Sequence, residues 1–292
     1  MTAPRPAPDA PLTLRDRVLL VLVPALLALP WRPRMALTGW IGRRVMGPRL
    51  APKVAAAVRH FLPALPPPEV ARIAAEVPGN LARLVVEVLS GPDLRRLAPQ
   101  VPIAGPGLAA LEAARDSGRP AILVTAHFGN YEAMRVALVH RGFRVGGYFK
   151  DFQHPAMTRL YLRSVEGAGQ PLFADTGEGR KGMIRHLKGG GMLGILIDLD
   201  RPNGVLLDFL GQPTRTVLSL AEMALKYDAL LVPVWGLRVP GQPGFRVQID
   251  APVPPSDPRS MTQAVNDAFS AQVRAHPDQW VWWHRRRKPG HP

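Results

Sequence analysis

From residue 105 onward, short runs of apolar residues alternate with segments of helical periodicity, and this alternation constrains the fold more than any other feature. The runs are AILVTA, FRVGGYF, PLFAD, MLGILIDLD, LLVPVWGLRV and FRVQID, and the segments between them include GLAALEAARDSG and YEAMRVALVHRG. Strands that are apolar throughout are buried on both faces, and strands separated by helices pair in parallel. The sequence therefore predicts an α/β fold with a mainly parallel sheet and helices on both faces.

The basic residues of the chain are concentrated near its start. Arg and Lys together number 37 against 22 acidic residues, for a net charge of +15, and residues 1–60 hold ten of the basic and two of the acidic ones. The same region contains VLLVLVPALLALPW (18–31), which has arginines on both sides. Apolar residues between arginines suit an anionic membrane surface better than a nucleic acid. We expect a membrane-anchoring helical region over 1–60 and an α/β domain over 61–292.

The apolar stretch at 18–31 is too short to cross a membrane. It has fourteen residues and contains Pro24, whereas a spanning helix needs roughly 20 apolar residues. A shallow or interfacial anchor fits best. Two alternatives stay open: a signal peptide, although PWRPR does not resemble a small-residue cleavage site, and a buried amphipathic helix of the globular domain.

Several kinds of site lack support in the sequence. Cysteine is absent, so there is no disulfide framework, thiolate metal site or cysteine nucleophile. The eight histidines show no metal-ligand spacing, and we predict no metal. Gly177, Gly179 and Gly182 satisfy the dinucleotide pattern G-x-G-x-x-G after PLFAD, but the following helix is too short for the usual crossover, which argues against a nucleotide-binding oxidoreductase.

The segment AHFGNYEAM (126–134) has the pattern of a functional strand end. Ligands of parallel sheets bind at the carboxyl ends of the strands, where His127 lies. The chain must then turn at Gly129 and begin a helix, for which Asn130 is a good N-cap. Glu132 falls in the first helical turn, where the helix dipole stabilises a carboxylate. Capping alone could account for these residues, so the segment by itself leaves its role open.

His127 and Glu132 together make the histidine and carboxylate half of a catalytic triad. The chain contains no G-x-S-x-G nucleophile elbow. The pair therefore favours a general base that activates a hydroxyl brought in by the substrate.

HFGNYE resembles the H-x-x-x-x-[DE] signature of the lysophospholipid and glycerol-phosphate acyltransferases, and its aromatic residue and Glu resemble the lipid A biosynthesis late acyltransferases. Three further blocks are similar to that family and follow its order: 179–200 with its Asp-x-Asp, 204–238, and HPDQWVWWHRRRK at 276–288. The chain departs at Leu199, where family members often carry Gln, and in HRRRK, where an aromatic residue often precedes the lysine.

The resemblance implies an O-acyltransferase with a glycerol-phosphate acyltransferase-like fold. His127 would deprotonate a hydroxyl of a lipid A precursor, Glu132 would orient His127, and the hydroxyl oxygen would attack the thioester of an acylated acyl carrier protein. Backbone N–H groups of Gly129 and Asn130 would bind the developing oxyanion. No cofactor beyond the acyl-carrier-protein thioester is implied, and the expected location is the cytoplasmic face of a bacterial inner membrane.

Four further residues are candidate substrate contacts. Arg163 lies at the distance behind the His-Glu block at which family members place an arginine, and it would bind an acceptor phosphate. Asp198 and Asp200 lie at a strand end and would position the sugar or support that arginine. Arg215 would meet a phosphate. Two other functions stay open: transfer to a lysophospholipid or ornithine-type lipid, and a non-enzymatic basic protein that binds anionic membranes.

Overall fold

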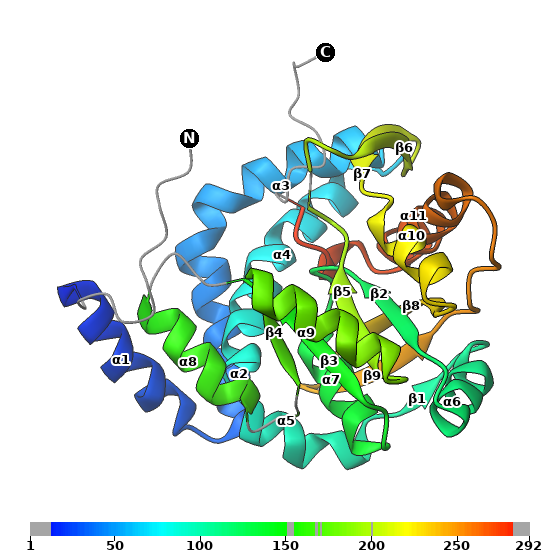
Figure 1. The fold of residues 1–292 in the computed structure, drawn as a ribbon. Helices are drawn as coiled ribbons and strands as arrows, with labels where there is room; N and C mark the ends of the chain where they lie inside the picture. Colours follow the sequence, from blue (N-terminus) through cyan, green and yellow to red (C-terminus); the bar gives the residue numbers. More distant parts are fainter. Residues whose placement is uncertain (1–12, 151–154, 167–168, 170, 200, 283–292) are drawn as a thin grey trace.

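The computed structural model describes residues 13–150, 155–166, 169, 171–199 and 201–282, and its centre is a seven-stranded sheet (Figure 1). The strand order is β1-β9-β8-β2-β5-β3-β4. All neighbours pair in parallel except β8 and β9, which are antiparallel. The prediction of a mainly parallel sheet is confirmed. The bounds are β1 (Ile103–Ala104), β2 (Ala121–Thr125), β3 (Val145–Phe149), β4 (Leu172–Ala174), β5 (Met192–Leu196), β8 (Leu230–Arg238) and β9 (Phe245–Ile249).

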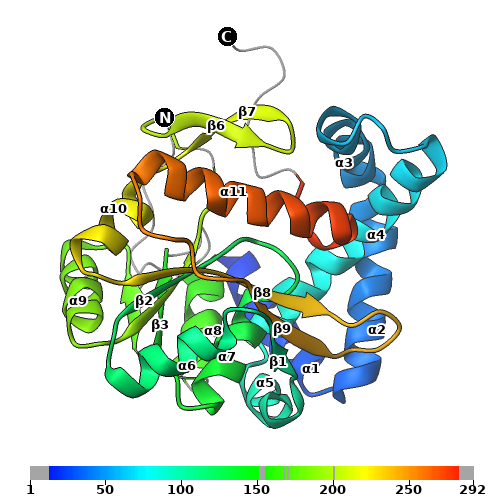
Figure 2. The ribbon, with the colours of Figure 1, turned by 90° about the vertical axis from the view of Figure 1, so that its right-hand side faces the viewer.

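Helices cover both faces of the sheet (Figure 2). Leu111 of α6 and Met134 of α7 pack in one core cluster with Leu123 of β2, whereas Leu187 of α9 and Leu220 of α10 pack in another with the neighbouring strand residues. The two clusters alternate along β2, because successive side chains of a strand point to opposite faces. The helices on the sheet are α5 (Gly91–Leu97), α6 (Leu108–Ser117), α7 (Tyr131–His140), α8 (Pro155–Glu166), α9 (Gly177–Lys188), α10 (Ser219–Lys226) and α11 (Pro258–Ala275).

The N-terminal region is helical, and its apolar stretch at 18–31 lies mostly in the first helix and ends at the first residue of the second. The order is α1 (Leu14–Leu27), α2 (Trp31–Ile41), a π-helix (Gly42–Met46), α3 (Gly47–Phe61) and α4 (Pro67–Val88). Pro30 caps α2, and the chain changes direction there. Among the described residues, no helix combines the length and the apolarity that crossing a membrane would require.

Helix α1 is apolar on two sides. Leu20, Val23 and Leu27 pack against a cluster that includes Leu160 and Tyr161 of α8. The opposite side remains exposed, and the exposed apolar side chains continue through α2 and the π-helix: Leu14, Val18, Val21, Leu22, Leu29, Leu37, Trp40, Ile41 and Val45. Exposed apolar residues in such number mark an interaction surface.

A third core cluster joins the N-terminal helices to the rest of the chain. Val54 and Phe61 of α3 pack in one cluster with Phe128, which follows β2, and with Trp280 near the end of the described chain. The ring of Phe61 makes an edge contact with that of Trp280, with the centroids 6.1 Å apart. The region predicted to anchor the chain thus shares a core with the segment that carries His127.

A two-stranded hairpin was not foreseen in the sequence. Strands β6 (Val205–Phe209) and β7 (Gln212–Thr216) pair antiparallel and lie over α11 (Figure 2). The two turn residues, Leu210 and Gly211, have φ of 56° and 81°, which is the left-handed conformation of a tight hairpin. Leucine is unusual at such a position. The Leu210 N–H donates to Ser270 Oγ of α11 at 3.0 Å and holds the turn in place.

Candidate active site

The turn that carries His127 is fixed by close contact between two backbone segments. Gly129 has φ of 56°, and a Cβ there would lie 2.0 Å from the carbonyl oxygen of Gly236 in β8. The Asn130 N–H donates to that carbonyl oxygen at 2.7 Å. A side chain at either glycine would force the segments apart, since a Cβ at Gly236 would meet the Asn130 carbonyl at 2.1 Å. The glycines therefore allow β2 and β8 to deliver the turn to one edge of the sheet.

Asn130 is the N-cap of α7, as the sequence predicts. Its side-chain Oδ1 accepts hydrogen bonds from the N–H groups of Glu132 and Ala133 at 3.0 and 2.8 Å. Asn130 is completely buried, so its amide N–H groups also need partners. The Nδ2 group donates to Glu87 Oε2 at 3.0 Å.

The carboxylate that contacts His127 belongs to Asp198. Asp198 Oδ1 lies 2.9 Å from His127 Nδ1, and Oδ2 accepts the backbone N–H of His127 at 3.1 Å. Asp198 has no exposed surface, whereas the His127 side chain is 25% exposed. A carboxylate on Nδ1 favours the tautomer with the proton on that nitrogen, which leaves the Nε2 lone pair as the base.

Trp280 also donates a hydrogen bond to Asp198. Its indole Nε1–H donates to Asp198 Oδ2 at 3.2 Å, and the ring is 1% exposed. The backbone around Trp280 pairs with the His127 turn: the Gly129 N–H donates to the Gln279 carbonyl at 2.9 Å, and the Val281 N–H donates to the His127 carbonyl at 3.2 Å. Trp282 is also buried, with 3% of its surface exposed. Trp283 lies outside the described residues.

Glu132 does not make the hydrogen bond that the sequence led us to expect. Its carboxylate accepts Nε–H of Arg135 with both oxygens at 3.1 Å and Nη2–H at 2.5 Å. Both side chains are 4% exposed. Residues three positions apart lie side by side on a helix, so Glu132 on α7 reaches Arg135. The carboxylate that contacts the His127 imidazole is instead that of Asp198, which follows β5.

Arg135 links this ion pair to the segment after α8. Its Nη1–H donates to the Gly169 carbonyl at 2.9 Å. Burial works against its charge, but the attraction of Glu132 prevails and raises the pKa of the guanidinium. Tyr131 and Tyr161 lie near the same carboxylate, and burial, followed by the charge of Glu132, raises the pKa of each phenol well above its usual range. The ring of Tyr131 also makes an edge contact with the His127 imidazole, with the centroids 5.8 Å apart.

The two backbone groups expected to bind an oxyanion already have acceptors. The Gly129 N–H donates to Gln279 and the Asn130 N–H to Gly236, both through backbone carbonyls. An oxyanion hole requires donors aimed at the reacting oxygen. In this structure the N–H groups of Gly129 and Asn130 hold the turn in place and are not directed at a substrate oxygen. The expectation that these two groups bind the oxyanion is therefore corrected.

The other predicted substrate contacts are dispersed. Arg163 on α8 and Arg215 on β7 are both exposed, and within the described part of the chain neither forms a hydrogen bond to the residues around His127. Asp198 is at the centre of the site, in the role just described. Asp200 lies outside the described residues. The role of these residues in binding a substrate stays a prediction.

The pattern G-x-G-x-x-G has a structural explanation. Gly177, Gly179 and Gly182 fall inside α9, whose N-cap Thr176 accepts the Gly179 N–H at 3.0 Å. A Cβ at Gly179 would lie 2.0 Å from the Ala174 carbonyl of β4, so this glycine permits close helix-to-strand packing. Across the described residues, no three His, Asp or Glu side chains are grouped closely enough to hold a metal ion.

Four residues of the site were missed in the sequence: Glu87, Arg238, Gln279 and Trp280. Gln279 and Trp280 belong to the closing motif, and their position in a block shared with a known family was the available signal. Arg238 is the last residue of the 204–238 block, which is similar to the same family, whereas Glu87 had no comparable signal, because it is one of five charged residues in α4. Their contacts join segments separated by 151 positions.

Comparison with known proteins gives a consistent family. Residues 18–289 match the bacterial lipid A biosynthesis acyltransferase family. The phosphatidylinositol mannoside acyltransferase of Mycobacterium tuberculosis (strain CDC 1551 / Oshkosh) is 27% identical over 190 residues, which is 64% of this chain and 60% of that relative. The corresponding enzyme of Mycolicibacterium smegmatis (strain ATCC 700084 / mc(2)155) is 26% identical over 174 residues, 58% of this chain and 57% of its own length.

These curated relatives are thus matched over less than two thirds of their length. The family match, by contrast, covers nearly the whole chain, including the His127 turn, the Asp198 strand end and the Trp280 segment that the structure brings together. This chain belongs to the bacterial lipid A biosynthesis acyltransferase family.

Proposed function

We propose that this protein is an O-acyltransferase that moves a fatty acyl chain from an acyl-carrier-protein thioester to a hydroxyl of a lipid A precursor. The observation that carries the proposal is the contact between His127 Nδ1 and Asp198 Oδ1 at 2.9 Å, at the carboxyl end of a parallel strand. Family membership supports acyl transfer as the reaction.

The proposed reaction requires one base that later acts as an acid. His127 Nε2 takes the proton of the acceptor hydroxyl while its oxygen attacks the thioester carbonyl carbon. The tetrahedral intermediate then collapses, the carbon–sulfur bond breaks, and the imidazolium returns its proton to the departing thiolate. The products are an ester and a free thiol. Asp198 offsets the positive charge of the imidazolium, which exists only between these two steps.

Asp198 is well suited to this task because it is buried and anchored. The His127 backbone and the Trp280 indole each donate to Oδ2, which leaves Oδ1 directed at the imidazole. A carboxylate fixed in this way loses little freedom during the reaction. Glu132 has a structural role in this proposal: its buried ion pair with Arg135 stabilises α7, and we call it a brace in this sense.

A membrane surface is the proposed place of action. The exposed apolar side chains of α1, α2 and the π-helix, which include Val21, Leu22 and Trp40, are suited to lie among lipid headgroups and the upper acyl chains. The basic excess of the chain favours anionic lipids. A bacterial inner membrane, at its cytoplasmic face, would supply both the acceptor lipid and such a surface.

A second acceptor class is favoured by the names of the relatives. Two matched proteins are phosphatidylinositol mannoside acyltransferases, so a mannosylated phospholipid is an alternative to the lipid A precursor. Lysophospholipids and ornithine-type lipids are further candidate acceptors for the same reaction.

One assay tests the reaction and separates the acceptors. Purified full-length protein in detergent is offered acyl carrier protein or coenzyme A thioesters, each with a lipid A precursor, a phosphatidylinositol mannoside or a lysophospholipid. Mass spectrometry then follows addition of one acyl group. We expect a product that forms fastest from the acyl-carrier-protein thioester and the lipid A precursor. A preference for the mannoside would support the second class, and no product from any pair would refute acyl transfer.

A further inference from the structure

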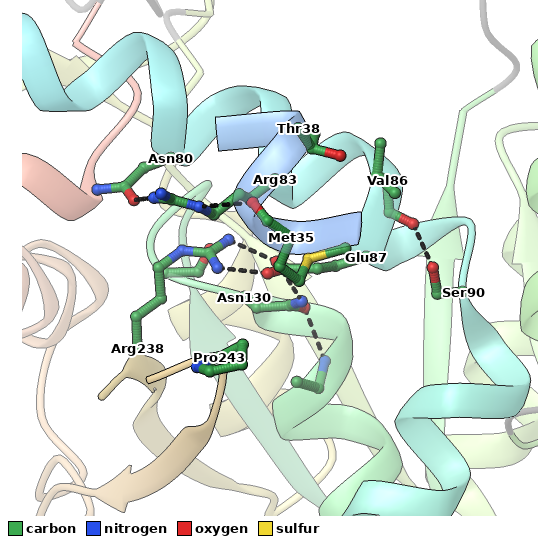
Figure 3. Close-up of polar contacts among 12 residues, drawn as sticks. Met35, Thr38, Asn80, Arg83, Val86, Glu87, Ser90, Asn130, Arg238 and Pro243 are labelled. Atoms are coloured by element: carbon green, nitrogen blue, oxygen red, sulfur yellow. Dashed lines mark hydrogen bonds and ion pairs between the residues drawn. The ribbon is translucent and has the colours of Figure 1, made fainter. Parts of the chain in front are cut away.

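A buried ion pair lies directly behind the turn that carries His127. Glu87, on α4, is 1% exposed, and Arg238 is the last residue of β8. The guanidinium contacts the carboxylate through two hydrogen bonds, Nη1 to Oε1 and Nη2 to Oε2, both 2.5 Å long (Figure 3). A paired, two-point contact of this kind fixes both side chains in orientation as well as in distance.

Both members of the pair reach the turn. Glu87 Oε2 also accepts Nδ2–H of Asn130 at 3.0 Å, and Arg238 Nη2–H points at the Gly129 carbonyl at 3.4 Å. Asn130 is therefore held at both ends of its amide, by Glu87 at the nitrogen and by the start of α7 at the oxygen. Its amide cannot rotate without losing either the cap or the bond to Glu87.

Arg238 is tied to the turn a second time through its backbone. The Arg238 N–H donates to Gln279 Oε1 at 2.9 Å, and Gln279 Nε2–H donates to the Arg238 carbonyl at 3.2 Å. The Gln279 carbonyl accepts the Gly129 N–H. The result is a closed set of hydrogen bonds that joins α4, β8, the Trp280 segment and the turn.

A buried ion pair contributes little to stability when its desolvation is counted. A gain in stability therefore does not explain why Glu87 and Arg238 are buried together. Their contacts with Asn130 and Gly129 suggest a different reason. Asn130 and Gly129 lie within three positions of His127, and the turn sets where the imidazole meets Asp198. A misplacement of about 1 Å in reacting groups can reduce turnover about 100-fold.

We propose that Glu87 and Arg238 are positioning residues that hold the 127–130 turn so that His127 stays aligned with Asp198. This inference rests on the proposed function, because alignment matters only if His127 acts as a base. Neither residue touches the imidazole. Their effect passes through Asn130 and Gly129.

The chain offers a matched control in Arg83. Arg83 lines the same cavity of about 540 Å³ as Glu87 and Arg238, and it comes from the same helix as Glu87. Its hydrogen bonds go to Asn80 Oδ1 at 2.8 Å and to the Met35 carbonyl at 3.3 Å (Figure 3), so it is linked to α2 and α4 rather than to the turn. Burial, followed by the nearby charge of Arg238, lowers its pKa.

The test compares Arg238→Lys, Glu87→Gln and Arg83→Gln with the wild type. Arg238→Lys keeps a positive charge beside Glu87 but cannot bridge both Glu87 and Gly129, so it is the variant least at risk of misfolding. Hydrogen exchange of peptides spanning 126–134 reports on the turn without any substrate. The acyl transfer assay gives kcat and KM.

We expect faster exchange of the 126–134 peptides in Arg238→Lys and Glu87→Gln, a kcat lower by about 10- to 100-fold, and an unchanged KM for the thioester. A purely structural role would reduce the active fraction without faster exchange of these peptides in the protein that remains folded. Arg83→Gln should match the wild type in all of these measurements.

Unchanged exchange and a kcat within about two-fold of wild type in folded Arg238→Lys would overturn the proposal. So would an equal loss in Arg83→Gln. If the wild type transfers no acyl group, the proposed function fails, and the exchange of the 126–134 peptides still decides whether this pair holds the turn.

Discussion

At the residue scale, the site depends on which carboxylate contacts His127. Asp198 lies 71 positions further along the chain and reaches Nδ1 from the end of the neighbouring strand. Glu132 is only five positions away, but its helix directs it toward Arg135. Sequence proximity favoured the wrong orienting partner, because short spacing fixes which residues share a helix face and not which strand ends meet.

Replacing Asp198 by Asn tests its orienting role. The amide keeps the size of the side chain but can present its N–H to Nδ1, which would leave the proton on Nε2 and remove the base. We expect kcat to fall by about 10³- to 10⁴-fold, with only a small change in the thermal midpoint. Steady-state acyl transfer and thermal unfolding of the same preparation provide the measurements. A kcat within ten-fold of wild type would show that Asp198 does not orient His127.

Replacing Glu132 by Gln tests its role as a structural brace. The change leaves the Arg135 guanidinium buried without its carboxylate, so we expect the free energy of unfolding to fall by about 3–5 kcal/mol. The double variant Glu132→Gln with Arg135→Met should recover part of this loss, because it removes the unpaired charge as well. Chemical denaturation of the three proteins measures both effects. Equal stability of the single variant and the wild type would contradict the brace.

At the scale of elements, the sequence was informative wherever the signal is local. The central strands and most helices follow from apolar runs, periodicity and caps, and Asn130 was identified correctly as the N-cap of α7. The β6–β7 hairpin escaped notice because its turn places Leu210, rather than an Asn or Asp, at a positive φ. The pairing of the Trp280 segment with the His127 turn also escaped, since the two segments lie far apart in the sequence.

His186 of α9 leads us to predict that the stability of the protein depends on pH. His186 is half-buried, and its Nε2 lies 2.9 Å from the Arg144 carbonyl and 3.1 Å from the Met192 carbonyl. Burial lowers its pKa below the ordinary value, and the charge of Arg144 acts in the same direction. The folded state thus prefers neutral imidazole, so this contribution to stability is present above the unfolded pKa of about 6.5 and is lost as the pH falls below it.

The thermal midpoint should therefore decrease between pH 7.5 and pH 5.5. His276, whose pKa burial also lowers, contributes in the same sense. The variant His186→Asn removes one of the two groups and should show a smaller decrease over this interval. Thermal unfolding by circular dichroism at the two pH values gives the comparison. An equal decrease in the variant and the wild type would exclude His186 as a source.

Across the whole molecule, the N-terminal helices and the segments that form the site pack in one shared core. Phe61 of α3 packs on Trp280, and Trp280 donates to Asp198. Composition predicted an apolar, basic surface in this region, but not that it shares a core with the turn that carries His127. Periodicity describes one helix at a time, and the packing of α3 against the end of the chain depends on tertiary contacts.

This arrangement predicts that membrane binding can be weakened without disturbing the site. Val21→Ser with Trp40→Ser removes two side chains that are 68% and 53% exposed. Their loss should weaken binding to vesicles containing anionic lipid by about 10-fold or more, because each buried apolar side chain contributes about 1.5–3 kcal/mol. Vesicle sedimentation measures the binding, and turnover with a detergent-dispersed acceptor should stay within two-fold. Unaltered vesicle binding would mean that another surface meets the membrane.

In the proposed mechanism, His127, oriented by Asp198, removes the proton from an acceptor hydroxyl during acyl transfer. The most direct measurement is acyl transfer by His127→Gln, followed by mass spectrometry of the lipid product, in protein shown to be folded by its thermal midpoint. We expect a loss of turnover of at least about 10³-fold, since the base is removed while the turn and Asp198 remain. Turnover near the wild-type rate in that variant would exclude His127 as the base.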